Sequence, residues 1–212
     1  MLRNSINIMV DCETTALNAS EGRITSLVAV PFEIDNDLKL LSWDFTDRFI
    51  SIIHDDEFEM FQNPDTMAYR EANKIREMEL VLADQQSAAD DGLDYYTQCA
   101  QRFDDYIKYL RMTYAESTIW LWAKPSHFDM SFITDMFYAS ERKFPISHRN
   151  IMCLMTFIET VGLIPGQTMA DFYKDHPMVQ PAHNPVNDAV HQIYLLEIAL
   201  NYYRERLSSA FK

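Results

Sequence analysis

The first apolar run of this chain ends in two acidic residues, and this ending constrains the fold most. Ile6, Ile8 and Val10 occupy alternate positions, as in a β-strand, and Asp11 and Glu13 close the run. Two such acids project from one face of a strand, about 7 Å apart along the backbone. They repel each other and resist burial unless a cation neutralises them. The ending indicates a metal site, although two solvated, inert acids fit it equally well.

Further apolar runs alternate with helical repeats and predict an α/β fold. We expect strands over residues 24–34, 40–49, 118–123 and 151–154. Helices are expected from about Asp65 or Thr66 towards residue 86, over 94–114, 128–140 and 156–161, and from Pro185 onward. Three strands forming an antiparallel meander, followed by parallel strands and helices, resemble an RNase H-like mixed five-stranded sheet flanked by helices.

Length and charge narrow the function. The 212 residues, 48% of them hydrophobic, predict one domain with an acidic helical insertion around residues 54–100. The net charge of −14 excludes a broad coating of long nucleic acid, which relies on many Lys and Arg contacts to phosphate. A nucleic-acid enzyme is still possible, because divalent cations on a carboxylate cluster reverse the local field.

Cysteine spacing and the N-terminal residues suggest a compartment. Cys12, Cys99 and Cys153 form no CxxC pair, so neither a disulfide framework nor a zinc site is indicated. The N-terminal residues show no signal-peptide pattern, and no apolar run approaches the roughly 18 residues of a membrane span. We expect the cytoplasm of a bacterium or of a phage-infected host.

Three residues in the second half of the chain have structural explanations as well as functional ones. Asp129 follows the predicted strand 118–123 and could cap the next helix, which is the stronger reading of this residue alone. Asp188 falls in the first turn of the last helix, where the helix dipole stabilises a carboxylate. His183 could be an ordinary surface histidine. Each residue alone is a weak signal of a site, and the order and spacing of all of them together make a shared site more probable.

Together these residues resemble the DEDDh branch of the 3'-5' exonuclease superfamily. Its three motifs are matched by Asp11-Cys12-Glu13-Thr14-Thr15, by Phe128-Asp129, and by His183 with Asp188. Within the branch, residues 63–67 and 122–124 make the chain most similar to the phage exonuclease A (DexA) group and related bacterial exoribonucleases. The resemblance spans nearly the whole chain.

The resemblance implies a catalytic role for each motif residue. Asp11, Glu13, Asp129 and Asp188 would hold two Mg2+ or Mn2+ ions, with Asp11 the best candidate to bridge them. His183 would take a proton from the nucleophilic water, and Glu13 would take part in catalysis as well as in metal binding.

The resemblance also implies a substrate. The enzyme would shorten single-stranded nucleic acid from its 3' end, with DNA favoured and RNA possible, and release nucleoside 5'-monophosphates. The backbone at Thr14 and Thr15 would contact the terminal nucleotide, and Leu17 would wedge against a base. Phe128 would stack on the substrate or, more simply, pack beneath Asp129.

Two departures leave the substrate preference open. Residues 124–127 lack the Asn that many relatives carry before the second-motif Asp, and residues 149–153 lack an acid. The basic stretch 142–149 either guides the incoming strand or is an ordinary solvated loop. An RNase H-like endonuclease or resolvase, and an inactive exonuclease-like interaction protein, are the alternative functions. The oligomeric state stays open, with a dimer possible.

Overall fold

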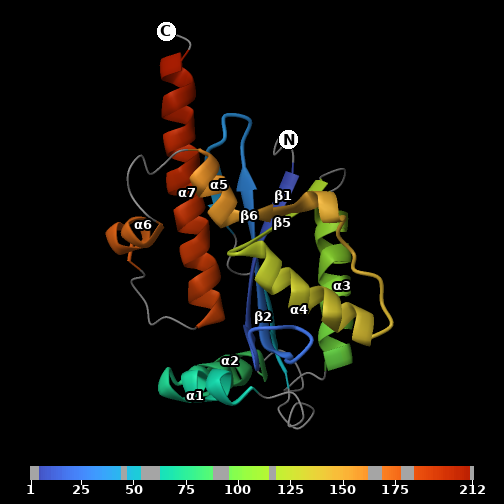
Figure 1. The fold of residues 1–212 in the computed structure, drawn as a ribbon. Helices are drawn as coiled ribbons and strands as arrows, with labels where there is room; N and C mark the ends of the chain where they lie inside the picture. The colour runs from blue at the N-terminus through green and yellow to red at the C-terminus, as the bar shows by residue number, and fades with distance from the viewer. Residues whose placement is uncertain are drawn as a thin grey trace.

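A mixed six-stranded sheet forms the centre of the molecule (Figure 1). The computed structural model describes residues 5–43, 47–53, 63–87, 96–114, 118–161, 169–177 and 184–210. The strands are β1 (Ser5–Thr14), β2 (Ile24–Ile34), β3 (Leu40–Trp43), β4 (Phe49–Ile52), β5 (Thr118–Ala123) and β6 (Ile151–Cys153). The order is β3-β2-β1-β5-β6, and β4 also pairs with β2. β1 is antiparallel to β2 and parallel to β5, as predicted, so the strand that carries Asp11 and Glu13 is central in the sheet.

The predicted third strand, over residues 40–49, is interrupted. It consists of β3 and β4, which both pair with β2, so the sheet has six strands rather than five. The β3 pairs reach Phe32 and the β4 pairs reach Ala29, which leaves Pro31 between the two sets. Proline has no N–H to donate to a neighbouring strand, and no further pairing partner is expected at such a residue.

The helices of the described chain are α1 (Pro64–Ala72), α2 (Ile75–Ser87), α3 (Tyr96–Thr113), α4 (Ser126–Ala139), α5 (Leu154–Thr160), α6 (Met169–Asp175) and α7 (Pro185–Ala210). Asn63 caps α1, so this helix begins one or two residues before the predicted start, with Pro64 at its first position. The single helix predicted to run towards residue 86 is divided into α1 and α2. The start of α7 is as predicted, because the Asn184 side chain accepts hydrogen bonds from the N–H groups of Val186 and Asn187. The seven-residue α6 was not predicted from the sequence.

The two faces of the sheet bury separate apolar clusters, because side chains alternate along β1 and β5. Ile8 and Leu121 point to the cluster shared with α3 and α4. Met9 and Trp122 point to the cluster shared with α5 and α7. α7 therefore runs along one face, and α3 and α4 cover the other (Figure 1). None of the described helices is long and apolar enough to cross a membrane.

Candidate metal centre

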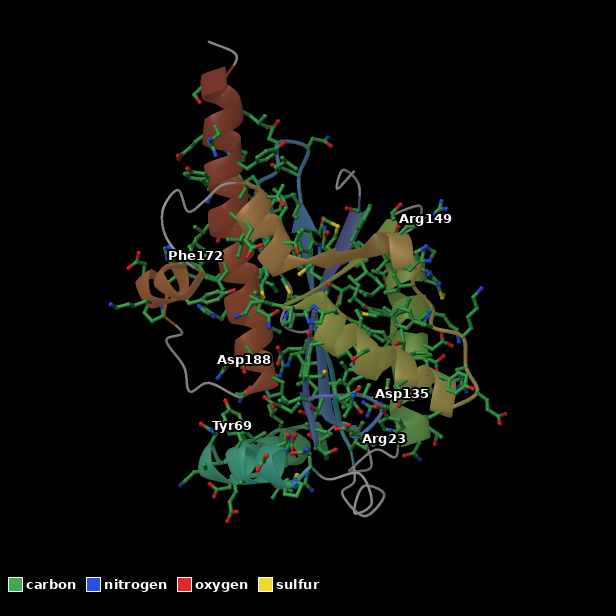
Figure 2. The ribbon with its side chains drawn as sticks, viewed as in Figure 1. Arg23, Tyr69, Asp135, Arg149, Phe172 and Asp188 are labelled. Atoms are coloured by element: carbon green, nitrogen blue, oxygen red, sulfur yellow. The ribbon has the colours of Figure 1, made fainter. Side chains whose placement is uncertain are left out.

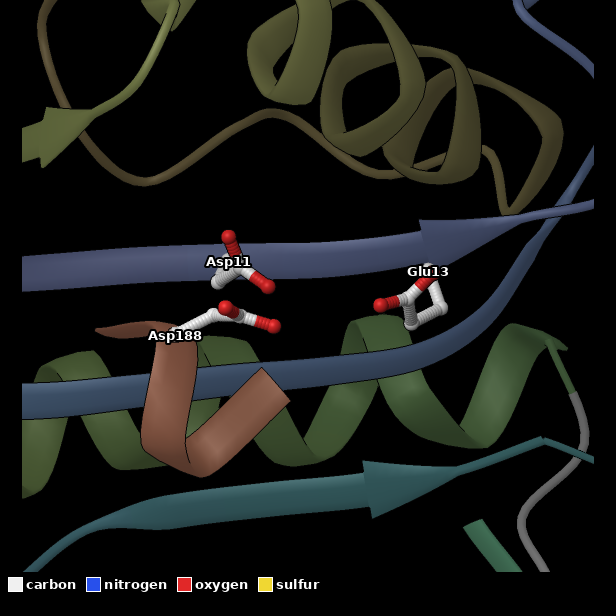
Figure 3. A group of neighbouring side chains, drawn as sticks. All are labelled: Asp11, Glu13 and Asp188. Carbon is white, nitrogen blue, oxygen red and sulfur yellow. The ribbon is translucent and has the colours of Figure 1, made fainter. Parts of the chain in front are cut away.

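Three carboxylates meet where β1 ends beneath the first turn of α7. Asp11 and Glu13 extend from β1, and Asp188 extends from α7 (Figure 3). Each offers a ligand oxygen, and these oxygens lie within 4.8 Å of one another. The Asn184 cap fixes the start of α7 and so fixes where Asp188 lies. Acids 177 residues apart, from the first and the third motif, thus converge.

Asp129 approaches the same strand from α4. Its Oδ1 accepts hydrogen bonds from the Cys12 N–H, at 3.2 Å, and from Cys12 Sγ, at 3.3 Å. Cys12 lies between Asp11 and Glu13, so Asp129 is beside the cluster, although it is outside the set of three within 4.8 Å. The reading of Asp129 as a helix cap is wrong, because Pro125 occupies the cap position and α4 begins at Ser126.

The second oxygen of Asp129 has no hydrogen-bond partner among the described residues, which do not include His183. Asp129 is 2% exposed, and its Oδ2 is buried without a hydrogen bond. A buried carboxylate oxygen without a partner is costly, and a cation beside it removes this cost. The four carboxylates therefore fit a divalent cation that prefers oxygen ligands, such as Mg2+ or Mn2+.

Burial and mutual repulsion raise the pKa values of these acids. The pKa of Asp11 is well above its ordinary value, because of burial and the charges of Asp129, Asp188 and Glu13. Burial raises the pKa of Asp129 to about 7, although hydrogen bonds from Cys12 oppose the rise. Burial also raises the pKa of Glu13 to about 8, against the lowering effect of Arg70. The metal-free cluster thus resists full ionisation near neutral pH, as expected of a site built to hold cations.

Gln192 supports the cluster and was missed by the sequence analysis. It is buried one turn after Asp188 on α7, and its side-chain amide nitrogen donates to Asp11 Oδ1 at 2.7 Å. This hydrogen bond lowers the pKa of Asp11 and so favours the carboxylate. The four-residue spacing from Asp188 places both side chains on one face of the helix, which is the signal that could have found it.

A buried ion pair lies behind Glu13. Arg70 of α1 is 4% exposed and Glu79 of α2 is 0% exposed, and Arg70 Nη2 lies 2.8 Å from Glu79 Oε2. The other Glu79 oxygen accepts hydrogen bonds from the hydroxyls of Thr25, at 2.6 Å, and Ser26, at 3.1 Å. Arg70 Nη1 also reaches the Thr14 carbonyl at 3.4 Å. The pair thus ties α1 and α2 to the end of β1, and no local sequence pattern distinguishes these two residues from their charged neighbours.

The remaining predicted site residues are placed as follows. His183 lies outside the described residues. Thr14 and Thr15 are buried, and both backbone groups of Thr15 are hydrogen-bonded within the protein, to Arg23 and Asn63. Leu17 is 80% exposed.

Phe128 is half-buried. Its ring centroid is 5.1 Å from that of Phe132, against the first core cluster, in accord with a packing role.

Tyr69 borders the site and was also missed. It lies on α1 below the first turn of α7, where Asp188 is (Figure 2). Glu13 and Asp188 are close enough for their charges to raise its pKa, after the larger effect of burial. Tyr69 is still exposed, so an aromatic side chain faces solvent beside the acids.

A family model describes residues 6–200, which is nearly the whole chain, as a 3'-5' exoribonuclease Rv2179c-like domain. The chain belongs to this family. The predicted resemblance to a DEDDh 3'-5' exonuclease is thereby confirmed, and so is the prediction of an enzyme of that kind. No curated protein matches the chain.

Solved structures share the fold. The chain is similar to the nuclease domain of 3'hExo, a DEDDh family member solved with bound rAMP, at a TM-score of 0.63 and 12% identity, over 93% of this chain and 92% of that one. It is also similar to E. coli exonuclease I in complex with a dT13 oligonucleotide, at a TM-score of 0.61 and 12% identity, over 98% of this chain. The match spans 43% of the exonuclease I chain, which is less than half of its length. The predicted RNase H-like α/β fold is confirmed.

Proposed function

We propose that this protein hydrolyses single-stranded nucleic acid from the 3' end and releases nucleoside 5'-monophosphates, using divalent cations held by Asp11, Glu13, Asp129 and Asp188. One observation carries the proposal most directly: oxygens of Asp11, Glu13 and Asp188 lie within 4.8 Å of one another in a chain of a 3'-5' exoribonuclease family. The unpartnered Oδ2 of Asp129 adds a fourth ligand beside them.

The ligand set favours Mg2+ or Mn2+. All four side chains offer carboxylate oxygens, which such hard cations prefer over the thiolate and imidazole ligands typical of zinc sites. Two cations held by these residues would supply positive charge to the attacking and leaving oxygens of a phosphodiester displacement. Asp11, at the centre of the sheet and oriented by Gln192, is the ligand we expect both cations to share.

His183 is the proposed base that takes a proton from the attacking water. It immediately precedes Asn184, the cap of α7, so the chain can bring it near Asp188. An ordinary imidazole titrates near pH 6.5, which suits proton transfer close to neutral pH.

The substrate contacts proposed here carry little base specificity. Tyr69 is exposed beside the cluster, and stacking on an aromatic ring tolerates any base. Leu17, four residues after Glu13, is also exposed and remains the proposed wedge. The resemblance to the DEDDh branch favours DNA, and exonuclease I was solved with dT13. The family description names RNA, and 3'hExo was solved with rAMP. Both polymers therefore need direct comparison.

The test uses 5'-labelled single-stranded 20-mers of matched DNA and RNA, with Mg2+ or Mn2+. We expect a ladder that shortens from the 3' end, stops with EDTA and is absent with Asp11→Ala. A blocked 3' end should prevent shortening, whereas an endonuclease would still cut. Failure to shorten either polymer contradicts the proposal and favours an inactive interaction protein.

The cytoplasm of a bacterium or phage-infected host remains the proposed location.

A further inference from the structure

Lys124 lies beside the acid cluster without pairing with it. It follows β5 directly and is half-buried. Burial lowers its pKa, while the negative charges of Asp11, Asp188 and Asp129 oppose that shift. These three acids are therefore close, yet no carboxylate of the described residues lies within 4.0 Å of the Lys124 ammonium. A lysine that served only as a counter-ion would be drawn into an ion pair with one of them.

An aromatic ring holds the ammonium instead. Lys124 Nζ lies 4.3 Å from the centroid of the Tyr173 ring, which is within the range of a cation–π interaction. Tyr173 belongs to α6, and Phe172 beside it is buried in the cluster shared with α7. His191 Nε2 of α7 lies 2.9 Å from the His176 carbonyl oxygen. α6 is thus anchored along α7 (Figure 2), and through Tyr173 it fixes the direction of the Lys124 side chain.

The charge balance of the cluster changes when cations bind. The bound cations offset the acids that attract Lys124, and the next anion to enter is the phosphodiester of the substrate. A lysine ammonium is a compact charge with three N–H donors, which suits a non-bridging phosphate oxygen. In a chain with a net charge of −14, a cation at this position also opposes the repulsion of the incoming strand.

We propose that Lys124 binds the phosphate group attached to the 3'-terminal nucleotide and that Tyr173 is the residue that positions it. This inference rests on the exonuclease function proposed above and adds a phosphate ligand to it. Lys124 occupies the segment 124–127, where the Asn of many relatives is missing, so this chain uses a charged residue in that segment.

The first test measures binding of the reaction product rather than activity. Calorimetry with Mn2+ present compares a nucleoside 5'-monophosphate with the nucleoside that lacks the phosphate. Lys124→Met should weaken monophosphate binding roughly 10- to 100-fold, as expected for a lost charge-assisted hydrogen bond, and leave the nucleoside unaffected. Lys174→Met is the matched control, because Lys174 follows Tyr173 and is exposed.

The second test uses the salt dependence of binding to a single-stranded 20-mer with Mn2+ present. Losing one phosphate contact should reduce the slope of log K against log[salt] by about 0.7 for Lys124→Met, and by nothing for Lys174→Met. Lys124→Arg should keep the slope. Tyr173→Phe, which keeps the ring, should behave as wild type, whereas Tyr173→Leu should weaken monophosphate binding at an unchanged melting temperature.

The possible results distinguish a failure of the Lys124 proposal from a failure of the proposed exonuclease function. A wild-type protein that shortens no oligonucleotide contradicts the exonuclease proposal. An active wild type whose Lys124→Met variant keeps full monophosphate affinity and the full salt slope overturns the role of Lys124 alone. A Lys124→Met protein that binds Mn2+ more weakly than wild type also overturns it, because removing a cation beside the acids should not weaken metal binding.

Discussion

Asp188 and His183 lie five positions apart, and the proposed mechanism gives them different roles. Asp188→Asn removes one ligand charge from the cluster, so we expect loss of nearly all activity. His183→Ala removes only the base, and positioned acid–base groups contribute about 10²–10⁴-fold. Initial rates of release of a labelled 3'-terminal nucleotide, with Mg2+, compare the two.

The matched control for the acid is Asp37→Asn. Asp37 is an exposed turn residue far along the chain from the three motifs, so its loss should leave the rate unchanged. Wild-type activity in Asp188→Asn would contradict the ligand assignment, and a His183→Ala loss larger than that of Asp188→Asn would contradict the division of roles.

Leu17 tests the substrate side of the site. Because it is exposed, Leu17→Ala should change the free energy of unfolding by no more than about 0.5 kcal/mol. Losing the wedge against a base should raise KM for a single-stranded 20-mer roughly 10-fold, within the range measured for base contacts of this kind. Met112→Ala, at 81% exposure on α3, is the control. An unchanged KM in Leu17→Ala would remove Leu17 from the binding surface.

At the residue scale, the sequence predicted the acids but not their supports. Asp11 and Glu13 stand out because their spacing is local. Thr25 contacts Glu79 across 54 positions, and no local period reveals this contact. Gln192 contacts Asp11 across 181 positions, and only its four-residue spacing from Asp188 indicates it. Asp129 taken alone was interpreted as a helix cap, which is a common use of an acid that follows a strand. This interpretation was wrong, because α4 starts at Ser126, three residues before Asp129.

The elements around Glu13 depend on one buried ion pair. Arg70→Met leaves the Glu79 carboxylate buried without its closest cation, 2.8 Å away, and should lower the free energy of unfolding by about 3–5 kcal/mol. Urea denaturation measures the change. Glu77→Gln on α2, the helix of Glu79, is the control, because Glu77 is exposed and its contact with Lys74 is 3.9 Å, which is worth at most about 1 kcal/mol.

Arg76 also reaches Glu79, at 3.4 Å, and could take over part of the lost charge. We expect that Arg76 does not fully replace Arg70, because Arg70 is more buried than Arg76. A loss below about 1 kcal/mol in Arg70→Met would show that the ends of α1 and α2 are held by other contacts.

Most helices and strands were predicted from the spacing of apolar residues and from capping residues. β2 and β5 match their predicted bounds, and Asn184-Pro185 marks the start of α7 correctly. The third predicted strand is divided into β3 and β4, which pair with separate parts of β2, and the sequence of residues 40–49 alone does not show this pairing. α6 was missed, although α5, which has the same length, was predicted over residues 156–161.

The whole molecule should respond to pH through the metal-free cluster. The folded-state pKa values of Asp129, about 7, and Glu13, about 8, lie above those of an unfolded chain, near 4. The folded protein therefore holds protons that the unfolded chain releases, and stability falls as pH rises from about 4 to about 8. Urea denaturation in EDTA across this range measures the fall.

Bound metal should reverse this trend, since it replaces the protons. At a free Mn2+ concentration of 100 times Kd, binding should stabilise the fold by about 2.7 kcal/mol. Glu13→Gln should be less sensitive to pH in EDTA and should gain less from Mn2+. A stability in EDTA that rises between pH 5 and pH 8 would contradict the buried, mutually repelling cluster.

Diffraction from crystals soaked in Mn2+, recorded with its anomalous signal, tests the central claim most directly. We expect two manganese ions, about 3.5–4 Å apart, among the oxygens of Asp11, Glu13, Asp129 and Asp188. Crystals that bind Mn2+ elsewhere, or not at all, while these four carboxylates stay together, would contradict it.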